Sequence, residues 1–398
     1  MSEFQYFEFK AIERALTKEE QATLRSFSTR ATIGSRSFTN EYHWGDFKGD
    51  TVGWMKKYFD AHVYLSNFGS RALHLRIPRG LLGREEVRPY EVKRVLDMQE
   101  TASHLVLSIY SNDESGHDYD EHDEEPSEVL DTLLPLRDEL ARGDLRALYV
   151  AWLLAVRNGI VDEEMEEPPV PAGLNEPSDA LKSLTSFLWL DPELVEVAAR
   201  RSLPARPPLE SKVTPAAWLA TLSPEEKDDW LKRFLEDDEG SATLEFQRDF
   251  RHAVQRDLRA SGEVTTTSGL SPRRAGELLK EAEELAEARE QAAKLRAAEE
   301  RAAKARKDAE ERLIHLRTLV GQEENLWKSV IALTATSTPA NYDSAVRQLI
   351  DLRDLCVLTG GKDEFIARLT QFRDLRAKKP SLIARLDKAG LPCRLPGD

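Results

Sequence analysis

Aromatic and apolar positions alternate in part over residues 4–12, and this spacing predicts a β-strand. The strand is followed by Thr17-Lys18-Glu19-Glu20. Thr17 is a suitable helix N-cap, and Glu20 stands at the position from which a capping box is completed. The start of the chain therefore predicts a strand and then a helix.

Further strands are predicted over residues 31–43, 72–78 and 104–110, with a helix over residues 51–67. Together with the first strand and helix, these elements predict a small α/β sandwich domain over residues 1–111. Its helices are expected on one face of the sheet.

Residues 112–128 have no basic residue, and Tyr119 is their only aromatic or large apolar one. Such a segment buries too little surface to order itself, so we expect an acidic linker or exposed loop. Helical spacing then returns over residues 129–140, 144–156, 178–188, 192–201, 215–222, 224–235 and 241–259. Residues 129–260 are therefore predicted to form an all-helical domain.

Residues 261–271 are rich in Gly, Thr and Ser and predict a flexible joint. Residues 272–319 that follow are dominated by Ala, Glu, Lys, Arg and Leu, which predicts one long charged helix. Its best heptad column is interrupted by Glu299 and Arg306, so the central seam of a coiled coil is weak. Opposite charges at helical spacing support the helix without a partner. The three pairs are Glu290 with Lys294, Glu300 with Lys304, and Lys307 with Glu311.

Three interpretations of this helix stay open: a solvated spacer, a coiled coil that is intramolecular or forms a homo-oligomer through residues 272–319, and a helix packed along its length. The fold class expected for the whole chain is α+β and predominantly α-helical. It comprises the N-terminal α/β sandwich, the all-helical middle, the long charged helix or coiled coil, and a C-terminal helical hairpin over residues 320–398.

The C-terminal tail resembles a known group of proteins. Amphipathic spacing recurs at Ala345, Leu349 and Leu352, and again at Phe365, Leu369 and Phe372. With Trp327, Tyr342 and Lys378-Lys379-Pro380, residues 327–391 resemble the helical tail of uncharacterised bacterial SWIM zinc-finger proteins. The resemblance implies a helical-hairpin module of the tetratricopeptide-like kind. The Cys-x-Cys and Cys-x-His zinc ligands of that family are absent, because Cys356 and Cys393 stand alone.

Charge is distributed unevenly along the 398 residues, whose net charge is −15. Residues 1–270 carry 32 basic and 50 acidic residues, whereas residues 271–398 carry 24 and 21. An acidic front repels phosphate, so any nucleic-acid contact is expected from the C-terminal end.

Two cysteines allow no disulfide framework, and no apolar run reaches the length of a membrane span. We therefore expect a protein of the reducing cytoplasm that does not insert into membranes.

The basic end offers one candidate binding surface. It consists of Arg373, Arg376, Lys378, Lys379, Arg385 and Lys388. These residues form either a solvated face with helix-end charges, or a site for an anionic partner such as nucleic acid or the chain's own acidic loop.

A second candidate site, for a small ligand or peptide, follows the strand that ends near residue 43. It comprises Tyr42, His43, Trp44, Asp46 and Trp54. The alternative is that these aromatic residues only fill the core and a turn. The acidic loop at 113–125, with His117 and His122, holds metal-ligand residue types, but without apolar neighbours a solvated loop is the simpler interpretation.

Motifs of the common nucleotide-binding and hydrolase families are missing from the chain. Cys356 lies on an apolar helical face and is predicted to be a structural thiol. His62, His74 and His104 fall within predicted elements and are expected to be structural. No catalytic residue, cofactor or metal site is predicted.

These observations favour a cytoplasmic, bacterial-type adaptor or scaffold that binds a protein partner of unknown identity through helical modules. The alternatives are an enzyme with its site near His43, Asp46 and Glu41, and a nucleic-acid-associated protein that binds through the basic end.

Overall fold

The computed structural model describes residues 4–45, 47–112, 125–205, 211–237, 241–261, 273–336 and 338–391. The chain divides into two compact units, residues 1–288 and 289–398. The predicted fold class, α+β and predominantly α-helical, is confirmed.

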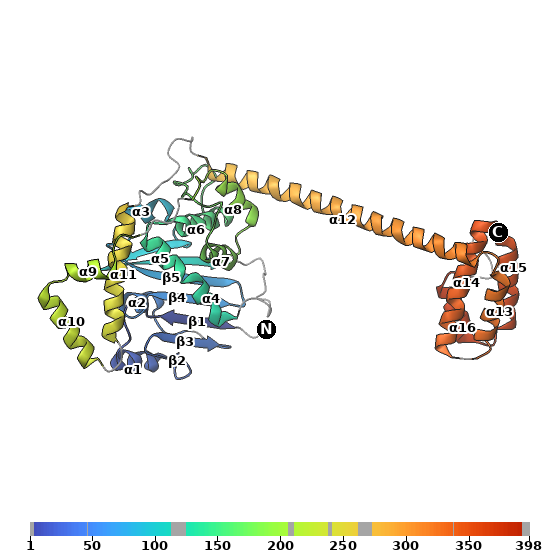
Figure 1. Ribbon diagram of the computed structural model, residues 1–398, viewed down its shortest axis with the longest axis horizontal. Coiled ribbons are helices and arrows are strands. Elements are labelled where there is room, and N and C mark those ends of the chain that lie inside the picture. The colour runs from blue at the N-terminus through green and yellow to red at the C-terminus, as the bar shows by residue number, and fades with distance from the viewer. Residues whose placement is uncertain are drawn as a thin grey trace. The chain divides into compact units, whose positions relative to one another are not determined.

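A seven-stranded antiparallel sheet forms the base of the first unit, with the strand order β2-β3-β1-β4-β5-β7-β6 (Figure 1). Its strands are β1 (Gln5–Lys10), β2 (Thr32–Ile33), β3 (Ser37–Tyr42), β4 (Ala61–Ser66), β5 (Ser70–Pro78), β6 (Leu96–Glu100) and β7 (His104–Asn112). The central strands β1, β4, β5 and β7 pair with a neighbour on each side.

Two strands depart from the sequence prediction. The helix expected over residues 51–67 ends early as α2 (Thr51–Lys57), and β4 follows it; β6 was not predicted. Five of the six residues of β4 are buried, so both of its faces are covered. The sequence of β4 does alternate, with Ala61, Val63 and Leu65 between His62, Tyr64 and Ser66, but a run of six residues is too short to separate it from the helical pattern that begins at Thr51.

One face of the sheet shares a single apolar core with the helical middle of the chain. Leu73, Leu75 and Leu107 on the sheet belong to the same buried cluster as Leu148 and Trp152. The helices of this layer are α4 (Pro126–Leu133), α5 (Pro135–Ala141), α6 (Arg146–Arg157), α7 (Asp179–Phe187) and α8 (Pro192–Ala199), with α3 (Arg84–Val87) and η1 (Arg88–Tyr90) at its edge. The structure thus differs from the prediction of separate domains over 1–111 and 129–260, because these helices bury their apolar faces on the sheet.

The opposite face of the sheet carries a second, aromatic core. Phe9 and Phe38 pack there against Trp54 and Met55 of α2, and Leu24 of α1 (Lys18–Phe27) joins them. Helices therefore cover both faces, rather than one as predicted. The capping box of α1 is confirmed: Glu20 N donates to Thr17 Oγ1 at 3.2 Å and Thr17 N to Glu20 Oε2 at 2.9 Å.

Three helices lie at the side of this unit, namely α9 (Pro215–Thr221), α10 (Pro224–Glu236) and α11 (Ser241–Ser261). In Figure 1, α11 lies nearest the sheet, and α9 and α10 lie on its outer side.

The long helix predicted over residues 272–319 is present as α12 (Ala275–Leu319). Its first turns belong to the first unit, where Ala275 and Leu278 are buried in the large core. Just before them, buried Arg273 donates to Glu167 at 2.7 and 3.0 Å. The helix therefore begins at a firmly held point.

The second unit has its own core around Trp327, Leu349, Phe365 and Leu382. Its helices after α12 are α13 (Glu323–Leu333), α14 (Pro339–Thr359), α15 (Lys362–Leu375) and α16 (Pro380–Lys388). The amphipathic spacing at Ala345–Leu352 and at Phe365–Phe372 corresponds to α14 and α15, and α13 and α16 add two helices to the predicted hairpin. The resemblance to SWIM-protein tails stays a prediction.

Candidate functional site

The predicted site after β3 is not gathered into one place. Trp54 is buried in the aromatic core, and Tyr42 packs edge-on against Phe7 at 5.8 Å between ring centroids. Trp44 is 67% exposed, with the guanidinium of Arg30 5.1 Å from its ring centroid, and His43 is exposed beside Phe4. Asp46 lies outside the described residues. The described members thus belong to core and turn packing.

Most of the basic end is used within the second unit. Arg373 and Arg385 pair with Asp387 and Asp343, at 2.5 and 2.8 Å. Lys379 donates to the Thr334 carbonyl at 2.6 Å, and Arg376 to Thr334 Oγ1 at 3.3 Å, at the end of α13. Lys378 and Lys388 are exposed. Four of the six residues therefore make contacts that hold the helices together.

The acidic loop at 113–125 lies outside the described residues except for Glu125. Among the residues that are described, no three His, Cys, Asp or Glu side chains are grouped so that they could hold a metal ion. Cys356 is half-buried on α14, and burial raises the pKa of its thiol, as does the charge of Glu323. Cys393 lies outside the described residues.

A buried carboxylate, Glu13, joins three parts of the first unit. It lies in the loop between β1 and α1 and is only 5% exposed. Arg137 of α5 donates to its Oε1, and His252 of α11 places Nε2 3.1 Å from the same oxygen. His104, at the start of β7, places Nε2 3.1 Å from Oε2.

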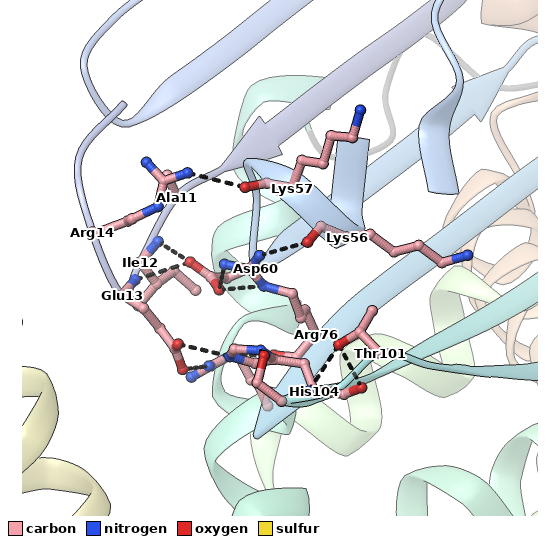
Figure 2. Close-up of polar contacts among 12 residues, drawn as sticks. Ala11, Ile12, Glu13, Arg14, Lys56, Lys57, Asp60, Arg76, Thr101 and His104 are labelled. Atoms are coloured by element: carbon pink, nitrogen blue, oxygen red, sulfur yellow. Dashed lines mark hydrogen bonds and ion pairs between the residues drawn. The ribbon is translucent and has the colours of Figure 1, made fainter. Parts of the chain in front are cut away.

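A second buried carboxylate, Asp60, fixes the loop that carries Glu13. Its Oδ2 accepts from the backbone N–H of Ile12 and of Glu13, at 2.6 and 2.9 Å. Its Oδ1 accepts from Arg76 Nε and Nη2 at 2.9 and 2.7 Å. Figure 2 shows Asp60 between the loop and Arg76, with Glu13 pointing toward His104. Both charges are thus paired and hydrogen-bonded, as buried charges require.

The surroundings of Glu13 keep it ionised. Burial by itself raises the pKa of a carboxyl group. Hydrogen bonds from His104 and His252, together with the positive charge of Arg137, outweigh burial and hold the pKa of Glu13 well below its usual range. The network therefore binds α5, α11 and the sheet around one negative charge.

Ser103 Oγ lies 2.7 Å from His104 Nδ1, so Ser103, His104 and Glu13 form a hydrogen-bonded chain. A hydroxyl, an imidazole and a carboxylate in this order are the parts of an activated nucleophile. Here, however, the carboxylate already serves Arg137 and His252, and Ser103 lies in an exposed turn. We therefore interpret the network as a structural cross-link.

The histidines His62 and His74 pair across β4 and β5, as the structural interpretation predicted, with ring centroids 5.1 Å apart. His62 Nδ1 is 2.8 Å from the Glu8 carbonyl, and its ring stacks on Phe9 at 3.7 Å. Burial lowers the pKa of His74 to about 4. Burial also lowers the pKa of His62 well below its usual range, and the nearness of His74 adds to this because two protonated rings would repel each other. Both are neutral core residues.

An open apolar surface of the first unit lies on α9–α11. Trp230, Phe234 and Phe246 contact one another, with centroids 5.1 to 5.9 Å apart, and Trp218 packs edge-on against Phe246 at 4.9 Å. None of the thirteen residues of α10 is buried. Beside the rings, Leu231 is 59% and Leu235 87% exposed. We call Trp230, Leu231, Phe234, Leu235 and Phe246 the α10 surface.

Polar contacts attach these three helices to the rest of the unit. Besides His252 with Glu13, Gln255 Nε2 donates to Asp138 Oδ1 at 3.0 Å, and Arg259 pairs with Glu86. In the described part of the chain, no side chain of residues 211–261 belongs to either apolar core of the sheet. The helices are therefore held by hydrogen bonds and ion pairs.

The middle of α12 is exposed at every residue from 286 to 311. Two of the predicted pairs are formed there, Glu290 with Lys294 at 2.7 Å and Lys307 with Glu311 at 3.8 Å. Leu295 is the one large apolar side chain in this stretch, and it is 63% exposed. Of the described helices, none is both long and apolar enough to cross a lipid bilayer.

Comparison with protein families, with curated proteins and with solved structures gives no match for this chain.

Sequence reasoning missed both the Glu13 network and the openness of α10. The helical spacing of Trp230, Phe234 and Leu235 was visible, and it predicts an amphipathic helix. Whether the apolar side of that helix is covered depends on contacts from elsewhere in the chain. The network joins residues up to 239 positions apart, and no local pattern signals such a contact.

Proposed function

We propose that this protein is a non-enzymatic adaptor that binds protein partners through its helical modules. The observation that carries the proposal is the α10 surface: a helix of thirteen residues with no buried side chain and with aromatic and leucine residues open to solvent.

The energetics of α10 support this role. Isolated helices shorter than about 12–15 residues are marginal in water, and most helices gain their stability by burying an apolar face. Half-exposed aromatic residues beside arginine are also typical of the residues that dominate protein interfaces. Arg233 fits this composition, because its guanidinium lies 4.1 Å from the Trp230 ring centroid and pairs with Glu245. A partner with an apolar helical face would cover this surface.

The division of the chain supports an adaptor rather than a single binding module. Two units with separate cores share the continuous helix α12, whose middle is exposed and stabilised by charge pairs. Each unit can thus carry its own interaction. A homo-oligomer formed through residues 272–319 is a second way to use the exposed stretch, and sedimentation of the full chain at increasing concentration tests it.

The test compares full-length variants in affinity capture from the native cell extract. Leu231→Asp with Leu235→Asp places two charges on the α10 surface, whereas Leu375→Asp, in a residue 75% exposed on α15, is the matched control. We expect a partner that the unchanged chain and the control both capture, and that the double variant loses.

A partner lost only with Leu375→Asp would place the interaction on the tail and refute the role of α10. Equal capture by all three proteins would mean that neither the α10 surface nor the region around Leu375 binds the captured partner.

A further inference from the structure

An open pocket of about 650 Å³ lies where α7 meets α8. Ligand pockets commonly enclose about 300–1,000 Å³. The apolar lining comes from Leu174, Leu190, Val195 and Ala199, and the indole of Trp189 adds an aromatic wall. These residues play no part in the Glu13 network or the α10 surface.

The backbone at Trp189 is unusual for a large side chain. Trp189 N donates to the Ser186 carbonyl and Leu190 N to the Thr185 carbonyl, both at 3.0 Å. This is the pair of bonds of a Schellman motif, in which the residue after the helix cap is usually glycine because its φ is positive. Trp189 occupies that position with φ +50°. For a bulky residue, such a φ is a true outlier, because the side chain crowds the backbone in this region.

Arg71 holds the indole in place from one side. Its guanidinium lies 3.6 Å from the Trp189 ring centroid, and its Nη1 donates to the Phe187 carbonyl at 3.0 Å. Arg71 is buried and does not line the pocket. One face of the Trp189 ring therefore packs on Arg71, and the ring forms a fixed wall of the pocket. Because that face already makes a cation–π interaction with Arg71, the ring serves the pocket as an apolar surface.

Among the described residues that line the pocket, Asp191 and Glu196 are the ionisable ones, and both carry negative charge. Arg157 Nε lies 3.1 Å from Asp191, and Arg200 Nη2 lies 3.8 Å from Glu196, but neither arginine lines the pocket. An apolar floor with carboxylates at its rim matches a ligand that carries a positive charge on an alkyl chain.

From this pocket we infer a binding site for a primary alkylammonium group, with the alkyl chain on the Leu190 and Val195 side and the ammonium at Asp191 and Glu196. A free diamine and a lysine side chain of a protein both offer this chemistry. Binding at this site does not depend on the adaptor function.

The experiment is calorimetric and NMR titration of the full-length chain with two probes, 1,5-diaminopentane and a lysine-centred tripeptide blocked at both ends. We expect binding in the low millimolar range or tighter, weakened by salt. Binding of the diamine alone would assign the site to free amines, and binding of the peptide would assign it to lysine of a protein.

Asp191→Asn with Glu196→Gln should weaken binding about tenfold or more, because each substitution keeps the side-chain shape and removes its charge. Glu193→Gln, on the same helix but outside the pocket, should leave binding unchanged. The inference is overturned if neither probe binds, if hexanoate binds as well as the amines, or if the Glu193 variant loses as much as the double variant.

Discussion

Two groups of helices are attached to the same sheet unit in opposite ways. Helices α4–α8 bury their apolar side chains in the core of the sheet, and ten of the twelve residues of α6 are buried. Helices α9–α11 keep an aromatic cluster of their own and are attached through Glu13, Asp138 and Glu86. The first arrangement builds a fold, whereas the second leaves an apolar surface available to a partner.

The largest expected effect separates the two groups by stability. Trp152→Ala in α6 removes a fully buried ring and should lower the free energy of unfolding by about 3–5 kcal/mol. Trp230→Ala in α10 removes a half-exposed ring and should lower it by less than half as much. Denaturant unfolding followed by circular dichroism measures both, and equal losses would contradict the comparison.

Next in size is the charge network that α11 shares with the sheet. Arg137→Met leaves Glu13 buried with fewer partners and should lower the free energy of unfolding by about 3 kcal/mol at neutral pH.

The same network predicts a pH dependence. The pKa of Glu13 is lowered in the folded state, so its contribution is present above the unfolded-state pKa of about 4.3 and is lost as the pH falls below it. Glu13→Gln should therefore flatten the decline in stability between about pH 4.5 and pH 2. An unchanged slope in this variant would show that other carboxylates cause the decline.

A smaller effect is expected from the remaining attachments of α11. Gln255→Ala with Arg259→Ala removes contacts to Asp138 and Glu86, each worth about 1 kcal/mol. Amide hydrogen exchange of residues 215–261 should accelerate about thirtyfold, the factor that about 2 kcal/mol corresponds to, while α6 and β5 keep their protection. Acceleration over the whole unit would mean that α9–α11 are part of one cooperative fold.

The smallest effect is expected on the α10 surface. Because Leu231 and Leu235 are exposed, replacing both with Asp should change the free energy of unfolding by less than about 0.5 kcal/mol per site. The same denaturant experiment checks this, and a larger loss would show that these leucines are covered within the chain.

Local patterns predicted the elements whose signals are local. Thr17 and Glu20 predicted the start of α1, and Thr214 and Ser223, each followed by Pro, mark the starts of α9 and α10. Composition predicted α12, because a run of helix-forming residues without proline has few alternatives.

What the patterns missed depends on tertiary contacts. The strand β4 is only six residues long and follows α2 closely, so its pattern merged with that of the helix. The helices after residue 125 show their apolar sides without showing that the sheet covers them. Likewise, the sequence near the C-terminus suggests basic residues that could bind a partner, but Arg373 and Arg385 form ion pairs with Asp387 and Asp343.

Site-specific photo-crosslinking reports directly whether a partner contacts the α10 surface, because it captures the contact without removing it. A photoreactive phenylalanine analogue is placed at Leu231 of the full-length chain, or at Leu375 as the reference position, and irradiated in the native cells. We predict a protein adduct from position 231, identified by mass spectrometry and suppressed by Leu235→Asp in the same chain. If position 231 gives no adduct, or if the adduct forms equally well with Leu235→Asp present, the α10 surface does not bind a partner.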